Sequence, residues 1–226
     1  MERQSVKSQD AAVALDQTGP SRNTPPPGLP QVPRTLSGVE ESAWQLLRRG
    51  TKDRRSAFHT LTLATVASEG LPEMRVVVLR EVDRERRLLR FNTDLRTPKF
   101  AELTANPRVA IQGYDPRRKV ALRLAGIART EAGTERVQAV WDGMKDMSRE
   151  CYRVGQSPST PIPSPEESPL HGLSEEEAFA NFALVDVVLT RLEWLYLRHG
   201  GHMRARVTWP DDAAPGSAPD ATWLVA

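Results

Sequence analysis

The feature that most constrains the fold is a succession of short β-favouring runs. Five runs rich in Val, Leu, Thr and Phe follow one another between residues 57 and 129, and Ser68, Glu69 and Gly70 supply a turn after the first. Three more lie near the carboxyl end, so that the predicted strands are 57–66, 74–80, 88–93, 109–114, 120–129, 182–191, 193–197 and 203–209. Many short strands joined by turns, with few helices between them, favour an antiparallel barrel over a parallel βαβ sheet. The predicted fold is therefore mainly β, with α-helical additions.

Four helices are predicted around these strands. Capping boxes formed by Ser37 with Glu40 and by Ser174 with Glu177 open the first and the last of them. Gly50 is expected to end the first helix. The second helix begins at Thr97 and stops before Pro107, and the third runs from residue 134 to about 152.

Composition divides the chain into one domain with a tail at each end. Residues 1–36 are rich in Ser, Pro, Gln and Thr and are expected to be disordered. Residues 210–226, rich in Pro, Ala and Asp, are expected to form a loose carboxyl-terminal tail. The folded domain is thus predicted to span residues 37–209, with tryptophans 44, 141 and 194 in its core or at an interface.

Charge and cysteine content argue against several classes of protein. The 31 basic and 29 acidic residues nearly balance, so nucleic acid is not expected as the main partner. The single cysteine, Cys151, and the lack of a signal-like apolar segment favour the cytoplasm. No apolar stretch is long enough to span a membrane, and no metal ligands are assigned.

An anion site is indicated where basic residues meet a helix start. Arg75 and Arg80 bound a Val-rich strand, and their spacing places them on opposite faces. Thr97, Pro98 and Lys99 open a helix, where free N–H groups, a hydroxyl and an ammonium group can bind a phosphate. The alternative is that Thr97 only caps the helix and Lys99 is an ordinary solvated lysine.

Several motifs in a fixed order carry a family resemblance. They are residues 75–80 (RVVVLR), residues 91–99 (FNTDLRTPK), residues 106–110 (NPRVA), and residues 191–195 (RLEWL) followed by 200–204 (GGHMR). Together they resemble the pyridoxamine 5'-phosphate oxidase-like family, and particularly its Alr4036-type subgroup. The resemblance implies an FMN-binding split β-barrel that works as a homodimer, with flavin in clefts between the subunits.

Residue roles follow from the resemblance position by position. It implies FMN binding by Arg75, Val76, Val77, Val78, Thr93, Thr97, Lys99 and Arg204. It implies substrate contacts from Arg80, His202 and Arg153. No catalytic acid or base is assigned, because the redox step belongs to the flavin.

The same comparison shows departures from the oxidase pattern. Gly200 stands where the oxidase has a substrate-binding arginine, Ala121 where a flavin-contacting glutamine is usual, and Pro98 where an arginine is usual. We therefore expect FMN binding to be retained better than the oxidase's substrate. The predicted function is an FMN-dependent oxidoreductase acting on a small amine or alcohol. The alternatives are a flavin carrier or sensor without turnover, and a basic adaptor that binds nucleic acid.

Overall fold

The computed structural model describes residues 32–168 and 172–226. The fold described below is that of the compact unit Pro33–Ala226. The expected disordered tail, residues 1–36, therefore lies almost entirely outside the described residues. None of the helices in the described part of the chain combines the length and the hydropathy needed to cross a membrane.

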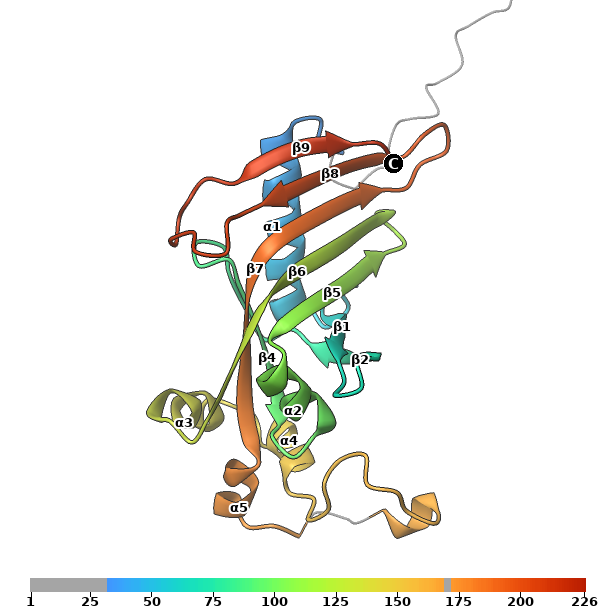
Figure 1. The fold of residues 1–226 in the computed structure, drawn as a ribbon. Coiled ribbons are helices and arrows are strands. Elements are labelled where there is room, and N and C mark those ends of the chain that lie inside the picture. Colours follow the sequence, from blue (N-terminus) through green and yellow to red (C-terminus); the bar gives the residue numbers. More distant parts are fainter. Residues whose placement is uncertain (1–31, 169–171) are drawn as a thin grey trace, which may run out of the picture. The chain divides into compact units, whose positions relative to one another are not determined.

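All strands of the described residues belong to one antiparallel sheet of nine strands (Figure 1). The order along the sheet is β2-β1-β5-β6-β7-β4-β3, and β8 and β9 continue from β7. Their bounds are β1 Thr60–Val66, β2 Pro72–Val78, β3 Glu81–Asp83, β4 Leu88–Asp94, β5 Arg108–Asp115, β6 Val120–Ala132, β7 Phe182–Tyr196, β8 Met203–Thr208 and β9 Asp220–Leu224. The prediction of a mainly β, antiparallel architecture is confirmed.

The two residues between β2 and β3 close the sheet into a barrel. Leu79 N–H donates to His59 O at 2.9 Å, and Arg80 N–H donates to Arg90 O at 2.8 Å. The chain thus leaves β1 and joins β4 without interruption, so the first and last strands of the order become neighbours. Side chains such as Leu63, Leu89 and Phe91 fill the barrel and are fully or almost fully buried.

Strand β7 belongs to both the barrel and the sheet that continues beyond it. Its first half, Phe182–Val188, pairs with β4, and its second half, Arg191–Tyr196, pairs with β8, while β6 pairs along both halves. The register shifts between Ala125 and Gly126, where Thr190 is the extra residue on β7. A Cβ at Gly126 would lie 2.4 Å from Val188 O, so only glycine fits this crossing. The two predicted strands 182–191 and 193–197 are therefore one bulged strand.

Helices cover the barrel and its extension. They are α1 Leu36–Lys52, α2 Pro98–Ala105, α3 Glu135–Asp142, α4 Asp146–Arg149 and α5 Glu175–Ala180, with short 3-10 turns η1 Glu150–Tyr152 and η2 Pro165–Glu167. Trp44 of α1 is fully buried, and its ring lies edge-on 6.3 Å from that of Trp209. Trp141 of α3 lies in a second apolar cluster with Tyr152, Phe179 and Phe182.

Some predicted element ends are wrong for identifiable reasons. Thr35, not Ser37, caps α1 by accepting a hydrogen bond from Gly38 N–H. Gly50 does not end α1, because it lies where Phe58 O approaches so closely that a Cβ would be 2.3 Å away. The predicted helix 134–152 breaks at Gly143 into α3, α4 and η1. The capping box of Ser174 with Glu177 is confirmed at α5.

The carboxyl-terminal segment is more ordered than expected. Residues 220–224 form β9, which pairs with β8 in register from Asp220 opposite Thr208 to Leu224 opposite Arg204. The loop before β9 is held by Arg87, whose guanidinium donates to the backbone carbonyls of Pro210 and Ala213. The description of residues 210–226 as a loose tail is therefore corrected for β9.

Candidate functional site

Arg75 lies on the barrel side of β2, as the alternation of the strand predicts. Its cross-strand neighbour is Leu63, which is fully buried. The Arg75 guanidinium donates to Glu102 Oε2 at 2.9 Å and to the Thr65 hydroxyl, which itself donates to Glu102. The side chain of Arg75 is 23% exposed, so it lies at the rim of the barrel and can reach a ligand.

The start of α2 lies at the end of β4, next to this rim. Thr97 is the N-cap residue and Pro98 follows it, but the Thr97 side chain makes no capping hydrogen bond. Its hydroxyl instead donates to Asp94 O at 2.7 Å and lies 3.4 Å from the Thr93 hydroxyl. The interpretation of Thr97 as a simple helix cap is therefore wrong. The first N–H groups of α2 keep their capacity to bind an anion.

Lys99 joins the side chains of Arg75 and Thr97. Its Nζ donates to Thr97 Oγ1 at 3.2 Å. Burial lowers the pKa of the Lys99 amine, the positive charge of Arg75 lowers it further, and the carboxylates of Asp94 and Glu102 oppose the shift. Arg75 and Lys99 are thus close enough for their positive charges to repel each other. An anion bound to both side chains would relieve this repulsion. We call Arg75, Thr93, Thr97 and Lys99 the cationic cluster.

Arg80 lies near the η1 segment. Its side chain is exposed and makes no hydrogen bond or ion pair with the described residues. Burial raises the pKa of both the Cys151 thiol and the Tyr152 phenol, and the positive charge of Arg80 opposes the shift in each. Arg80 therefore faces the η1 segment, where a ligand could meet its guanidinium.

The side chains of Val76, Val77 and Val78 differ in exposure. Val77 is buried in the barrel, whereas Val76 is 68% exposed on the opposite face. A flavin contact by this strand, as predicted, would be made by its backbone.

Arg153 directly follows η1, and its charge is neutralised. It forms ion pairs with Glu175 and Glu150, and Glu175 also accepts from Arg149 and Trp141. Arg96 fixes the following loop by donating to Val154 O at 3.0 Å and Gly155 O at 3.1 Å. The predicted substrate contact of Arg153 would require it to leave Glu175.

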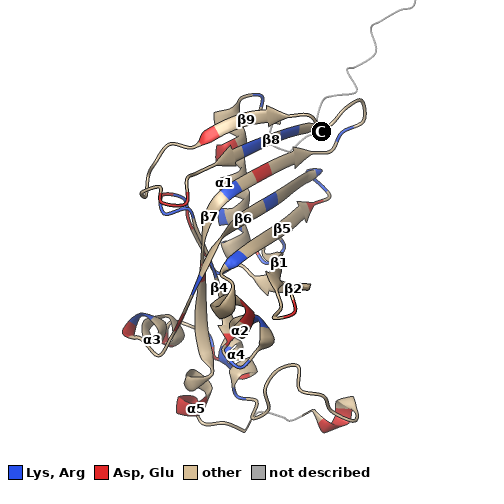
Figure 2. Cartoon of the chain, in the orientation of Figure 1, with Lys and Arg blue, Asp and Glu red and all other residues tan. Residues whose placement is uncertain are grey.

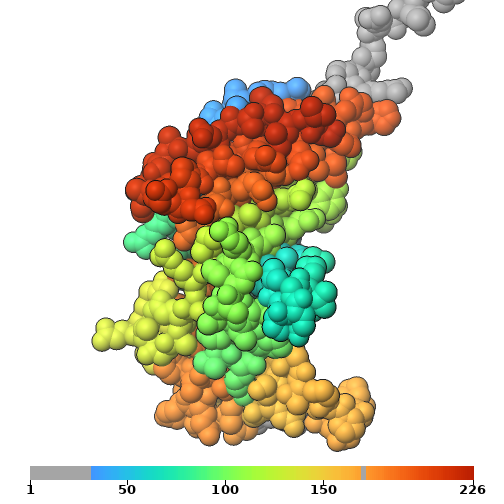
Figure 3. Space-filling view, in the orientation of Figure 1, coloured from blue at the N-terminus to red at the C-terminus, as the bar shows by residue number. Residues whose placement is uncertain are grey.

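Arg204 and His202 are not brought to the cationic cluster within one chain. Arg204 lies on β8 and pairs with buried Glu193, which also accepts from Arg206 Nε at 2.9 Å. Among the described residues β8 pairs with β7 and β9, and neither of these strands pairs with β2. In Figure 3 the red C-terminal strands and the cyan β1–β2 hairpin are separated by the green residues of β5 and β6.

The arginines around Glu193 form a separate basic surface. In Figure 2, blue bands on β8 and β6 flank a red band on β7. The side chains concerned are those of Arg204, Arg206 and Arg123, all within ion-pair distance of Glu193. Burial raises the pKa of Glu193, but Arg204 and Arg206 outweigh it, so that its pKa lies below the usual value.

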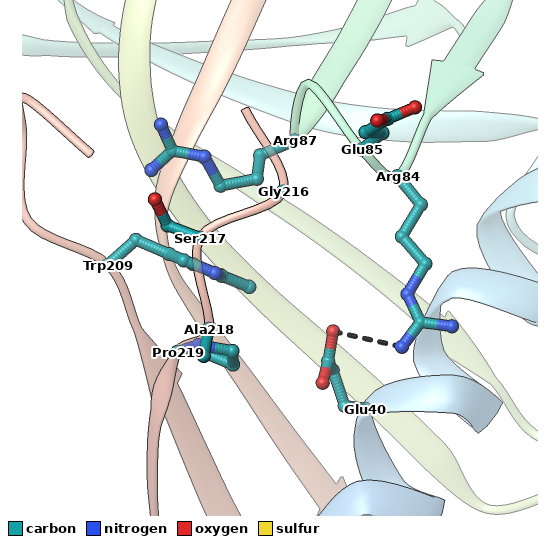
Figure 4. A pocket seen from close by; sticks show the side chains of 9 residues that line it. All are labelled: Glu40, Arg84, Glu85, Arg87, Trp209, Gly216, Ser217, Ala218 and Pro219. Atoms are coloured by element: carbon teal, nitrogen blue, oxygen red, sulfur yellow. Dashed lines mark hydrogen bonds and ion pairs between the residues drawn. The ribbon is translucent and has the colours of Figure 1, made fainter. Parts of the chain in front are cut away.

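A hollow of about 370 Å³ lies elsewhere, between α1, the β3–β4 turn and the loop before β9 (Figure 4). Its charged groups are largely partnered, since Arg84 pairs with Glu40 and Arg87 donates to backbone carbonyls. None of the predicted site residues lines it. We therefore place the candidate site at the cationic cluster.

Glu102 and Thr65 are members of the site that the sequence analysis missed. Glu102 follows Lys99 by three residues on α2, and this spacing places both on one face of the helix. That spacing was a usable signal. Thr65 had none, because only the pairing of β1 with β2 brings it to Arg75.

Comparison with known proteins finds a family match for part of the chain. Residues 41–131 match the model of the family described as pyridoxamine 5'-phosphate oxidase, FMN-binding domain. The predicted family resemblance is thus confirmed for this segment, whereas the narrower Alr4036-type subgroup stays a prediction. No curated protein matches the chain.

Two solved structures show the same fold. A pyridoxamine 5'-phosphate oxidase-related, FMN-binding protein from Nostoc punctiforme is 22% identical, with a TM-score of 0.64 over 82% of this chain and 96% of that one. PhzG from Burkholderia lata, in complex with tetrahydrophenazine-1-carboxylic acid, is 18% identical, with a TM-score of 0.60 over 82% of this chain and 88% of that one. At these identities the likeness concerns the fold, which is confirmed as a split β-barrel.

Proposed function

Since residues 41–131 belong to the FMN-binding domain family of pyridoxamine 5'-phosphate oxidases, we propose that this chain binds FMN and acts as an oxidoreductase. The observation that carries the proposal is the convergence of Arg75 and Lys99 at a helix start with no side-chain cap. These groups would hold the FMN phosphate, and the substrate would be a small amine or alcohol.

The donors of the cationic cluster suit a phosphate monoester. Such a group carries a charge of about −1.5 to −2 near pH 7 and accepts several hydrogen bonds. Arg75 offers a planar fork, Lys99 a compact ammonium group and Thr97 a hydroxyl. The uncapped N–H groups of α2 add partial positive charge at the same place.

The residues of the site would take different roles. Bound FMN would supply two-electron oxidation and reduction. Arg75, Thr97 and Lys99 bind and orient its phosphate, while the exposed guanidinium of Arg80 meets an anionic or polar group of the substrate. Arg153 contributes less to this model, because Glu175 and Glu150 already neutralise it.

We also propose a homodimer in which β8 of one chain completes the site of the other. One sheet face carries exposed Met74 (70%) and Val76 (68%) on β2, and Tyr114 (43%) on β5. Exposed apolar side chains gathered on one face are typical of an interface. A second copy packed on this face would allow Arg204 and His202 to approach the cationic cluster of its partner. Light scattering should then give about twice the 25.2 kDa chain mass.

The phosphate site is tested by titrating the apoprotein with FMN. Charge-assisted hydrogen bonds contribute about 1.5–3 kcal/mol each, so Arg75→Ala or Lys99→Ala should weaken FMN binding about ten- to a hundredfold. Arg117→Ala is the matched control, since Arg117 is exposed at the β5–β6 turn. Unchanged FMN affinity in both site variants would refute the proposed phosphate site.

Two features also favour a second candidate function. Glu175 neutralises Arg153, and Gly200 stands where the oxidase has a substrate-binding arginine. The protein would then bind flavin as a carrier or sensor without turnover. The two candidates are distinguished by mixing the flavin-loaded protein anaerobically with a set of amines and alcohols. Bleaching of the flavin absorbance by any of them supports the oxidoreductase, and no bleaching by the whole set supports the carrier.

A further inference from the structure

Glu102 places a buried carboxylate beside the residues that would bind phosphate. Its side chain is 10% exposed, and it accepts from Arg75 at 2.9 Å and from the Thr65 hydroxyl. Such a carboxylate could either compete with a phosphate for Arg75 or hold Arg75 in place for it. The hydrogen bonds of the guanidinium distinguish these two roles.

The two terminal nitrogens of Arg75 point to one side. One of them donates to Thr65 Oγ1 and, at 3.4 Å, to Glu73 O, and the other donates to Glu102 Oε2. Thr65 is 2% exposed and donates to the same carboxylate oxygen, so these three side chains form a closed network. The terminal edge of the guanidinium is therefore occupied by the protein.

The other edge of the guanidinium is open. Within the described residues Nε of Arg75 makes no hydrogen bond, and it is not among the buried polar atoms without a partner. Nε–H and the second hydrogen of the adjacent terminal nitrogen form a fork that can donate two parallel bonds to a phosphate. A phosphate bound at this edge does not need to displace Glu102.

We propose that Glu102, assisted by Thr65, is a positioning residue that sets the affinity of the site for the phosphate of its ligand. This inference rests on the proposed FMN function. By fixing the terminal edge of Arg75, Glu102 keeps the open fork directed at the anion. An unrestrained arginine loses more side-chain entropy on binding than one that is already held. The benefit of this restraint outweighs the repulsion between the carboxylate and the phosphate.

The test compares FMN with riboflavin, which has the same ring system without the phosphate. The ratio of their dissociation constants, measured on the full-length apoprotein, reports the phosphate contact alone. Glu102→Ala should weaken FMN binding about tenfold and leave riboflavin binding unchanged. Glu102→Gln, which keeps an acceptor for Arg75, should recover most of the FMN preference. Thr65→Val should lower the preference and Thr65→Ser should retain it.

A double-variant cycle shows whether Glu102 acts through Arg75. In the Arg75→Ala background, Glu102→Ala should have no further effect on the FMN preference. Three outcomes would overturn the inference: tighter FMN binding by Glu102→Ala, equal losses for FMN and riboflavin, or full additivity with Arg75→Ala. If Arg75→Ala itself leaves the preference unchanged, Arg75 does not contact the phosphate and the inference is overturned, whereas the proposed phosphate site is refuted only if Lys99→Ala also leaves FMN affinity unchanged.

Discussion

The protonation of Lys99 gives the proposed phosphate site a specific pH dependence. An ordinary lysine has a pKa of about 10.4. The pKa of Lys99 lies below this value because the amine is buried and because Arg75 is close. The phosphate of FMN keeps its full charge above about pH 7, since its second pKa is near 6. The charge of Lys99 is therefore the one that changes at the phosphate site as the pH rises.

The sign and size of the effect follow from linkage. Phosphate favours the charged amine, so bound FMN raises the pKa of Lys99 above its value in the free protein. FMN affinity should be constant below the pKa of the free protein and then fall by up to tenfold per pH unit. Affinity becomes constant again above the pKa of the complex. The fall should begin at a lower pH than the pKa of an ordinary lysine would give.

The assay is a series of FMN titrations of the apoprotein from pH 7 to about 10.5. Lys99→Arg is the matched variant, because arginine remains charged over this range, and its FMN affinity should not fall. Riboflavin titrations control for ionisation of the ring and for loosening of the fold. A parallel loss of FMN affinity in the wild type and in Lys99→Arg would refute the assignment to Lys99.

Two further predictions concern stability. Gly126→Ala should lower the free energy of unfolding in urea by about 2 kcal/mol or more, because its Cβ would lie 2.4 Å from the backbone oxygen of Val188. Gly155→Ala, where a Cβ meets nothing within 4 Å, is the control and should change stability little. Glu193 has a lowered pKa, so its contribution to stability is present above about pH 4.3 and is lost as the pH falls through its folded-state pKa. Glu193→Gln should therefore flatten the acid side of the stability curve, and an unchanged curve would argue against the ion pair with Arg204.

Local patterns in the sequence were sufficient for most of the fold. The β-favouring runs, the turn at Gly70 and the proline at the start of α2 each act through neighbouring residues, and the structure has strands and a helix at these places. The errors came from tertiary contacts. Gly50 was read as a helix stop, but it is required by the close approach of Phe58. β9 gains its stability from pairing with β8, which local composition does not show.

The candidate site was predictable to a similar extent. Arg75, Thr97 and Lys99 were identified from motif order, and the structure brings them together. Electrostatic partners were not predicted. Glu175 lies 22 residues after Arg153 in sequence yet neutralises it, and Glu102 reaches Arg75 only because α2 lies against β1. Ion pairs between distant segments depend on the folded arrangement, which the order of residues along the chain does not encode locally.

The extra residue Thr190 determines which side chains of β7 face inward on either side of it. Before the bulge the inward residues have odd numbers, as in Val185 and Val187, and after it they have even numbers, as in Leu192 and Trp194. Deletion of Thr190 would restore a regular alternation through the whole strand. Arg191 would then follow Leu189 directly, so Leu192 and Trp194 would remain on the inward face and Glu193 would keep its arginine partners. A single inserted residue thus lets one continuous strand bend from the barrel into its extension while the apolar side chains stay on the same face of the sheet.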